Sequence, residues 1–425
     1  MKSNYFKIGI LFIVLLGFLL TTNALAVDKV VLGHPACLSG KFAKPGAQAQ
    51  WGINASLKWI NQVKGGIEIG GRKVPLEYKR YDSESSKEMV TSLIERLVKI
   101  DKVNSVIAPY SSGLTITGAP VAEKYGSLYL SHGGASNRIF EQGYQYAVQA
   151  LSPATLYQAG ALDMFRKADP KAKRVALAFE DSEFARMVLR GAELYAKKLG
   201  FKVVFNHTYP ANVTDLTSLL SDLKAAKAEI IVGGGHFQDG QLFARQMADL
   251  NLNVKAISMI VAVTLPAFQE ALGDKAEGMF GPVQWEFGVK YSPEEAKKVG
   301  LPWFGPTNEE WLKMAMEFSG GKQPDYHAAE AGQVPLIYAK AVETANSVNP
   351  DKVRAAFNKL DFMTFFGEFK IDKDSGLQIG HTMAVVQWQG GKKEIVWPPA
   401  AATSKFYYPM PTFAQKAKGI KAVPK

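Results

Sequence analysis

The stretch that decides the fold reads VNSVIAPYSSG at residues 103–113, followed by SLYLSHGGAS at residues 127–136. Each piece contains a short apolar run and ends in a turn rich in glycine, proline or serine. Short apolar runs are typical of strands buried on both faces of a parallel sheet. Because such a turn also suits the start of a helix, each piece predicts one strand–loop–helix unit.

The same alternation of strands and helices extends along most of the chain. Before residue 150 it adds strands at Val30–Leu32 and Val74–Tyr78, and it restarts after Pro153. The second series has strands at residues 175–179, 201–205, 230–232 and 254–259. Crossover helices that cover parallel sheets produce this alternation. We therefore expect an α/β protein with two Rossmann-like lobes.

The first 26 residues have the features of an export signal. Lys2 and Lys7 precede an apolar run at residues 8–20, and Ala24-Leu25-Ala26 supplies small residues for cleavage. The run is shorter than the roughly 20 residues needed to span a bilayer. The sequence predicts a signal peptide at residues 1–26, cleavage after Ala26 and a periplasmic mature protein.

Charge and cysteine content narrow the function classes. Lysine and arginine total 50 and aspartate and glutamate total 39, but the basic residues are dispersed among acids. Without a basic run or a stacked-aromatic module we expect no nucleic-acid partner. Cys37 is the only cysteine, which excludes an internal disulfide and leaves its role open. We expect a monomer.

Common catalytic motifs are absent from the sequence. It has no Walker glycine loop, Gly-x-Gly-x-x-Gly, His-Glu-x-x-His or Gly-x-Ser-x-Gly, and its histidines do not pair at metal-ligand spacing. We expect no enzyme activity, cofactor or metal. One alternative stays open: an exported α/β hydrolase that uses Ser112 or Cys37 with a histidine.

Loops after the predicted strands are the candidate ligand site, because open α/β sheets bind ligands at the carboxyl ends of their strands. Helix starts in these loops carry unsatisfied N–H groups that hold anions. Ser112 together with the loop Gly133–Ser136 predicts a cradle for a carboxylate. The candidate loops are Pro35–Gly46, Tyr110–Gly113, Ser131–Asn137, Asp181–Phe184 and Gly233–Phe237.

Several short motifs occur in a characteristic order. They are Leu38-Ser39-Gly40, Asn61 with Lys64-Gly65-Gly66, Tyr81-Asp82, residues 106–112, the turn Ser131–Ser136, Pro324-Asp325-Tyr326, and residues 366–369 with Asp372 and Gly376. In order and spacing the mature chain resembles the leucine/isoleucine/valine-type periplasmic solute-binding proteins of ABC transporters.

This resemblance implies the type I periplasmic binding fold, with two lobes joined by three crossover segments and a ligand in the cleft between them. The first lobe would hold residues 28–150 and 280–377, and the second residues 151–279 and 378–415. The lobes would close on a ligand and the closed form would dock on a membrane permease. A chemosensory receptor could use the same closed form.

The resemblance also implies which residues hold a ligand carboxylate. By motif position they are Ser112, with its neighbour Ser111, and the loop residues Gly133, Gly134, Ala135 and Ser136.

The second lobe departs from the family pattern. Amino-acid binders place tyrosines and an acid at positions that match Phe184, Gly235 and residues 259–261 here. Without a counter-charge an ammonium would be costly to bury, so we expect an aromatic or branched hydrophobic carboxylate. Phe42, Tyr110, Phe184 and Phe237 could stack on such a ligand, with His236 beside them. The alternative is an amino acid whose counter-charge comes from Asp181, Glu183 or Asp239.

Overall fold

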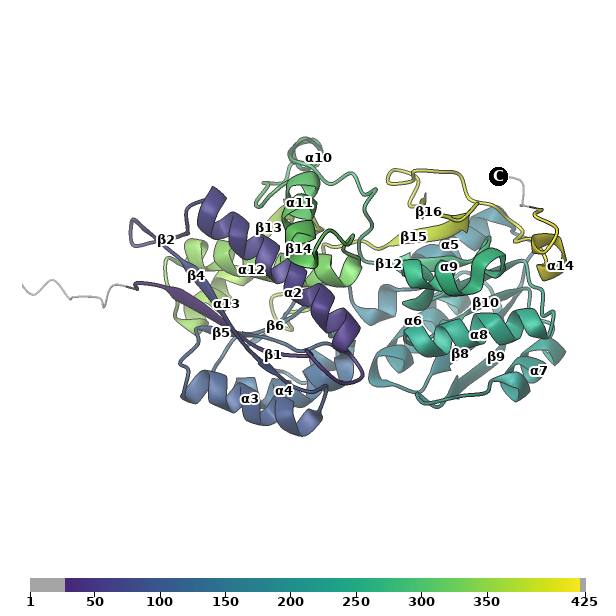
Figure 1. Cartoon of the computed structure of the whole chain (residues 1–425), viewed down its shortest axis with the longest axis horizontal. Coiled ribbons are helices and arrows are strands. Elements are labelled where there is room, and N and C mark those ends of the chain that lie inside the picture. The colour runs from purple at the N-terminus through teal and green to yellow at the C-terminus, as the bar shows by residue number, and fades with distance from the viewer. Residues whose placement is uncertain (1–26, 421–425) are drawn as a thin grey trace, which may run out of the picture.

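The computed structural model describes residues 27–420, which form two α/β lobes lying side by side (Figure 1). The predicted signal peptide, residues 1–26, lies outside the described residues. Among the described helices, none combines the length and apolar character required to cross a membrane.

The first lobe is built on a five-stranded parallel sheet in the order β4-β1-β5-β6-β7. Helices α2 and α12 cover one face, and α3 and α4 cover the other (Figure 1). The main elements are β1 (Val30–Ala36), α2 (Ala43–Lys58), β4 (Leu76–Asp82), α3 (Lys87–Lys99), β5 (Ser105–Ile107), α4 (Ser112–Lys124), β6 (Tyr129–Ser131), β7 (Ala147–Gln149) and α12 (Tyr326–Ala345).

Smaller elements complete the first lobe. A π-helical turn, η1, extends α2, and two short hairpins, β2–β3 and β13–β14, flank the helices. Their bounds are η1 (Trp59–Val63), β2 (Ile67–Ile69), β3 (Arg72–Val74), η2 (Asn137–Ile139), α10 (Pro293–Lys298), α11 (Asn308–Ser319), α13 (Pro350–Phe357), β13 (Asp361–Thr364) and β14 (Gly367–Lys370).

The second lobe contains a seven-stranded sheet in the order β16-β15-β12-β11-β10-β8-β9. The two strands that come last in the chain, β15 and β16, run antiparallel to their neighbours. The elements are η3 (Ala154–Leu156), α5 (Ala159–Ala168), β8 (Arg174–Glu180), α6 (Glu183–Lys198), β9 (Lys202–Tyr209), α7 (Thr217–Ala225), β10 (Ile230–Gly234), α8 (Phe237–Asp249), β11 (Ala256–Met259), η4 (Ala262–Thr264), α9 (Pro266–Leu272), η5 (Gly273–Ala276), β12 (Phe280–Val283), β15 (Ala384–Gln389), β16 (Lys392–Trp397) and α14 (Phe413–Lys416).

The predicted fold class, two lobes with parallel sheets, is confirmed, but one boundary is wrong. The resemblance implies that residues 280–283 belong to the first lobe, whereas β12 pairs with β11 and β15 in the second sheet. Gly281 and Pro282 give this short strand little strand propensity, which hides it in the sequence. The crossover to the first lobe therefore begins after Val283.

Three crossover segments join the lobes, and hydrogen bonds tie them to one another. Ser152 of the first donates its N–H to the Gln284 Oε1 of the second at 3.0 Å, and Gln284 Nε2 donates to the Ser152 carbonyl at 3.2 Å. The Ser152 Oγ lies 2.7 Å from Nδ1 of His381 in the third. All three side chains are buried. The crossovers thus form one hydrogen-bonded hinge.

Helix starts at the facing edges of the two sheets prepare the site. Helix α4 begins after Ser111, α6 after Ser182 and α8 after His236. The Ser182 Oγ accepts a hydrogen bond from the Ala185 N–H and caps α6, whereas the side chain of Ser111 makes no such cap. Three helix N-termini, from both lobes, therefore meet where the lobes face one another.

Candidate functional site

A small pocket lies between the lobes. Both sheets present the carboxyl ends of their parallel strands to it, the position at which open α/β sheets bind ligands. Its walls come from the loops after β5, β6 and β11, from the starts of α6 and α8, from the first crossover and from α12. The lining residues are Tyr110, Ser111, Gly133, Leu151, Tyr157, Phe184, His236, Val261, Tyr326 and Glu330.

Five of the predicted site residues line this pocket, namely Tyr110, Ser111, Gly133, Phe184 and His236. Phe42 is not among the lining residues, but its ring centroid is 5.4 Å from that of Tyr110 and 5.6 Å from that of His236. Phe237 does not line the pocket either, and the Lys44 ammonium lies 5.9 Å from the centroid of its ring. Gly134, Ala135, Ser112 and Ser136 are buried behind the wall.

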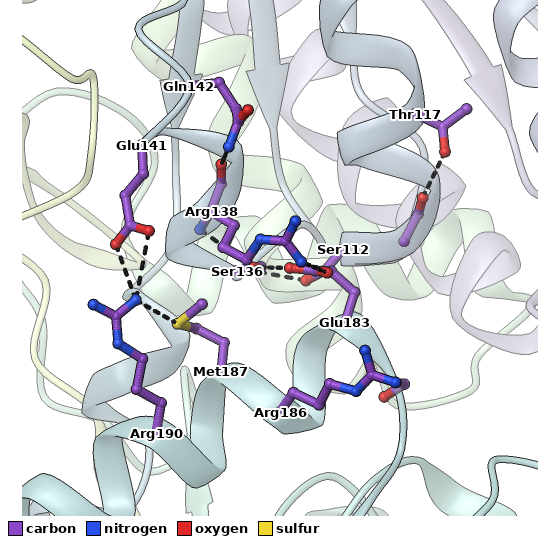
Figure 2. Close-up of polar contacts among 12 residues, drawn as sticks. Ser112, Thr117, Ser136, Arg138, Glu141, Gln142, Glu183, Arg186, Met187 and Arg190 are labelled. Carbon is purple, nitrogen blue, oxygen red and sulfur yellow. Dashed lines mark hydrogen bonds and ion pairs between the residues drawn. The ribbon is translucent and has the colours of Figure 1, made fainter.

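The residues of the predicted carboxylate cradle lie close together, and their polar groups bond to the protein. The Ser112 Oγ accepts a hydrogen bond from the Ser136 N–H at 3.1 Å, and the Ser136 Oγ donates to Glu183 at 2.8 Å (Figure 2). The Gly134 N–H donates to the Ser131 Oγ at 3.1 Å. A carboxylate that uses Ser112 or Ser136 would have to replace these contacts. Ser111 and Gly133 are the cradle residues that reach the pocket directly.

The lobes touch along the cleft. Glu183 of α6 bonds to Ser136 and Arg138, and Arg190 of α6 approaches Glu141 at 3.4 Å (Figure 2). On another part of the boundary the Lys41 Nζ lies 3.8 Å from Glu180. These contacts join the two lobes, so the structure has the geometry of a closed cleft.

The acids considered as counter-charges for an amino-acid ligand are engaged elsewhere. Asp181 pairs with Arg186 on the exposed side of α6, and Glu183 forms the contacts described above. The Asp239 Oδ2 accepts a hydrogen bond from the Tyr209 hydroxyl at 2.7 Å, and its Oδ1 accepts from the His236 N–H at 2.7 Å. None of the three lines the pocket.

His236 is the polar residue that the second lobe brings to the pocket. Its Nδ1 is hydrogen-bonded to the buried carboxylate of Glu180, and its Nε2 has no partner among the described residues. Burial disfavours ionisation of Glu180, but hydrogen bonds from His236 and Ser182 outweigh it and lower the Glu180 pKa. An ionised carboxylate only accepts, so Nδ1 carries a proton and, in a neutral imidazole, Nε2 accepts from the pocket side.

Glu180, His236 and Asp239 also form a possible metal-binding cluster. Within residues 27–420 this is the one group of three or more histidine, cysteine or acidic side chains whose potential ligand atoms all lie within 4.8 Å of one another. Each already has a protein partner, because Glu180 bonds to His236 Nδ1 and Asp239 bonds to Tyr209. The contacts explain the cluster as a hydrogen-bond network that orients His236.

Sequence reasoning missed five pocket residues, namely Leu151, Tyr157, Val261, Tyr326 and Glu330. Tyr157 lies in the turn between η3 and α5, where its hydroxyl accepts from Gln284 Nε2 at 2.9 Å and its ring centroid is 5.1 Å from that of Phe184. Tyr326 and Glu330 are four residues apart and share one face of α12. The sequence did contain one signal for Glu330, because this acid lies within the otherwise mostly apolar pattern of helix α12.

Comparison with known proteins identifies the family. A family model described as "Periplasmic binding protein" matches residues 29–393. The chain belongs to the periplasmic binding protein family. Over 404 residues it is 25% identical to the "Leu/Ile/Val-binding protein homolog 7" of Brucella suis, covering 92% of this chain and 97% of that one. The members of this family are solute-binding receptors of the periplasm that deliver small molecules to ABC permeases.

Solved structures of the periplasmic binding protein family share the fold. The branched-chain amino acid binding protein LivJ of Streptococcus pneumoniae, in complex with isoleucine, superposes with a TM-score of 0.70 at 21% identity, covering 87% of this chain and 100% of that one. A solute-binding protein of Rhodopseudomonas palustris in complex with p-hydroxybenzoic acid superposes with a TM-score of 0.72 at 18% identity. The match covers 90% of this chain and 98% of that one.

The two candidate nucleophiles of the hydrolase alternative have no general base beside them in residues 27–420. The Cys37 Sγ donates to the Tyr110 carbonyl at 3.0 Å, and burial, the dominant influence, raises the pKa of its thiol. The Ser112 Oγ is hydrogen-bonded to the Ser136 N–H. Nucleophilic catalysis needs a base within hydrogen-bond reach, and the hydrogen bonds of Cys37 and Ser112 given above are to backbone groups.

Proposed function

We propose that this protein is the receptor of an ABC importer and that it captures a small carboxylate with a hydrophobic body between its lobes. The observation that supports this most is the composition of the pocket. Tyr157, Phe184, Leu151 and Val261 supply apolar wall from the first crossover and the second lobe. Helix α4 begins at Ser112 on the opposite side.

The ligand carboxylate is proposed to face the start of α4. The first N–H groups of a helix lack partners within the helix and favour an anion. Ser111 and Gly133 already line this side of the pocket. Ser112 and Ser136 would join them by exchanging their mutual hydrogen bond for bonds to the ligand.

The hydrophobic body is proposed to lie against the rings. Tyr157 and Phe184 form an edge-to-face pair, and His236 lies 6.0 Å from Phe184. Such a surface suits an aromatic ring or a branched chain, because aromatic side chains offer a large apolar area. Ligands of both kinds occur in the related structures, as isoleucine and p-hydroxybenzoic acid.

The proposal also covers export, oligomeric state and partners. The signal peptide is cleaved after Ala26, and the mature chain acts in the periplasm as a monomer. It performs no bond chemistry, takes no part in nucleic-acid binding and passes its ligand to a membrane permease. The predicted lobe division, corrected at β12, provides the two bodies that close on the ligand.

A thermal-shift screen of the mature chain, residues 27–425, tests the function. A ligand present at 100 times its Kd adds about 2.7 kcal/mol to the free energy of unfolding, enough to raise Tm by several degrees. Aromatic and branched carboxylates should raise Tm, while sugars and inorganic anions should not. If sugars raise Tm and carboxylates do not, the proposed ligand class is wrong.

A further inference from the structure

We propose that Glu330 is a specificity-determining residue whose carboxyl group hydrogen-bonds a hydroxyl or amino substituent of the ligand. This inference rests on the proposed function, because it names the kind of carboxylate that the cleft takes. The expected ligands are hydroxy or amino acids with a hydrophobic body, in preference to the unsubstituted acids.

Glu330 is buried without a protein partner. Its side chain lines the pocket and the residue is 1% exposed. Its Oε1 has no hydrogen-bond partner in the described part of the chain, and the carboxyl group forms no ion pair there. A buried polar group without a partner is costly and calls for an explanation, such as a ligand that completes it.

Glu330 is one of two residues in α12 whose buried polar side-chain atom lacks a partner among the described residues. Every residue from Tyr326 to Ala339 is buried, a pattern that normally requires an apolar helix. The polar neighbours of Glu330 are satisfied. His327 Nδ1 lies 3.0 Å from Asp325, and Gln333 donates to the Ala150 carbonyl at 2.6 Å. The other residue, Tyr338, does not line the pocket, so Glu330 is the one whose missing partner a ligand could supply.

The surroundings of Glu330 indicate what it can bind. Tyr110, Tyr157 and Tyr326 line the same pocket, and no lysine or arginine does. Burial, and secondarily Asp325, raises the Glu330 pKa well above its ordinary value. A protonated carboxyl group can both donate to and accept from a hydroxyl group. A ligand ammonium could instead pair with the ionised Glu330 carboxylate, and the faces of the tyrosine rings would also attract this cation.

Two matched ligand series isolate the contribution of the substituent. Leucine, 2-hydroxy-4-methylpentanoate and 4-methylpentanoate differ only at the α-carbon. The compounds 4-aminobenzoate, 4-hydroxybenzoate and benzoate differ only at the ring position opposite the carboxylate. In at least one series, the wild-type protein should bind a substituted acid about tenfold or more tightly than the unsubstituted one by titration calorimetry, since a site built for a hydroxyl rejects the analogue that lacks it.

Substitution of Glu330 separates this role from a structural one. Glu330→Met should bring that affinity ratio close to one, mainly by weakening the substituted acid. It should also raise the Tm of the ligand-free protein, because it removes an unpaired buried polar group. Glu330→Gln should keep the preference for the hydroxy acids. It should lower the affinity for leucine, because the ammonium group of leucine loses its counter-charge.

Gln333→Met is the matched control, one turn along the same helix. It should lower Tm, because the Ala150 carbonyl loses its donor, and leave the affinity ratio unchanged. An unchanged ratio in Glu330→Met, or a lower Tm of this variant without ligand, would overturn the role of Glu330 alone. If the wild-type protein binds none of the six acids, the proposed function fails, and this inference fails with it.

Discussion

Glu183 of the second lobe accepts a hydrogen bond from Arg138 of the first, with 2.8 Å between Oε2 and Nη1 (Figure 2). Its other oxygen accepts from the Ser136 Oγ at 2.8 Å. Because Ser136 also donates its N–H to Ser112, this contact connects the closure of the lobes with the predicted carboxylate loop. Lobe closure and ligand binding should therefore be coupled at this point.

Glu183→Gln should weaken closure. The variant loses the charge opposite Arg138, a partly exposed pair for which about 0.2–1 kcal/mol is typical. We expect ligand affinity to fall by up to about fivefold and the ligand-free protein to have a larger radius of gyration by small-angle scattering. Arg186→Gln is the control, because Arg186 pairs with Asp181 inside the second lobe. Equal affinities and radii for Glu183→Gln and the wild type would contradict the coupling.

Ser152→Ala should destabilise the hinge. The hydroxyl group lies 2.7 Å from His381 Nδ1, and its removal takes a hydrogen bond from a buried ring nitrogen. Such a loss costs about 1–3 kcal/mol, which urea unfolding would measure. Ser221→Ala, at an exposed serine of α7 that bonds to the Thr217 carbonyl, should change stability by less than about 0.5 kcal/mol. Equal losses for both variants would show that the hinge contact has no special role.

Stability should decrease in mild acid. Burial lowers the pKa of His381 to about 4 and that of His132 to about 3, from an ordinary 6.5. Between these values and 6.5 the unfolded chain binds more protons, so the free energy of unfolding falls as pH drops below 6.5. His132→Leu should reduce this pH dependence in urea unfolding at pH 7 and pH 5. A slope identical to that of the wild type would show that His132 does not contribute.

Phe184→Ala should weaken ligand binding by about tenfold or more. Its ring packs on Tyr157 at 5.1 Å and on His236 at 6.0 Å, so truncation opens the apolar wall of the pocket. Titration calorimetry with the ligand found in the screen measures the loss. Phe205→Ala, in strand β9 beside His207, removes a ring from a strand that contributes no pocket residue and should leave affinity unchanged. Similar losses in both variants would point to a general loss of folding.

The repeating parts of the fold could be predicted from the sequence. Apolar strands such as β5 and β8, and helices such as α3 with its buried Val90, Leu93 and Leu97, carry their periodicity in a short window. The loops after these strands had to meet at one edge of each sheet. Consistent with that rule, Tyr110, Gly133 and Phe184 line one pocket.

The rest of the site depends on long-range packing that local patterns do not contain. Glu330 reaches the pocket because α12, near the end of the chain, packs against α2 near its beginning. Tyr157 lies in the turn between η3 and α5, which has no regular periodicity, and β12 is hidden by Gly281 and Pro282. Such residues come together only when the two lobes and three crossovers are assembled.

The most direct test of the central claim is titration calorimetry of the mature chain, residues 27–425, with the ligand of largest thermal shift, for the wild type and Phe184→Ala. The account predicts saturable binding of one carboxylate per chain and a marked loss of affinity in the variant. Binding with full affinity in Phe184→Ala would contradict a ligand site between the lobes. No heat with any carboxylate would contradict the proposed ligand class.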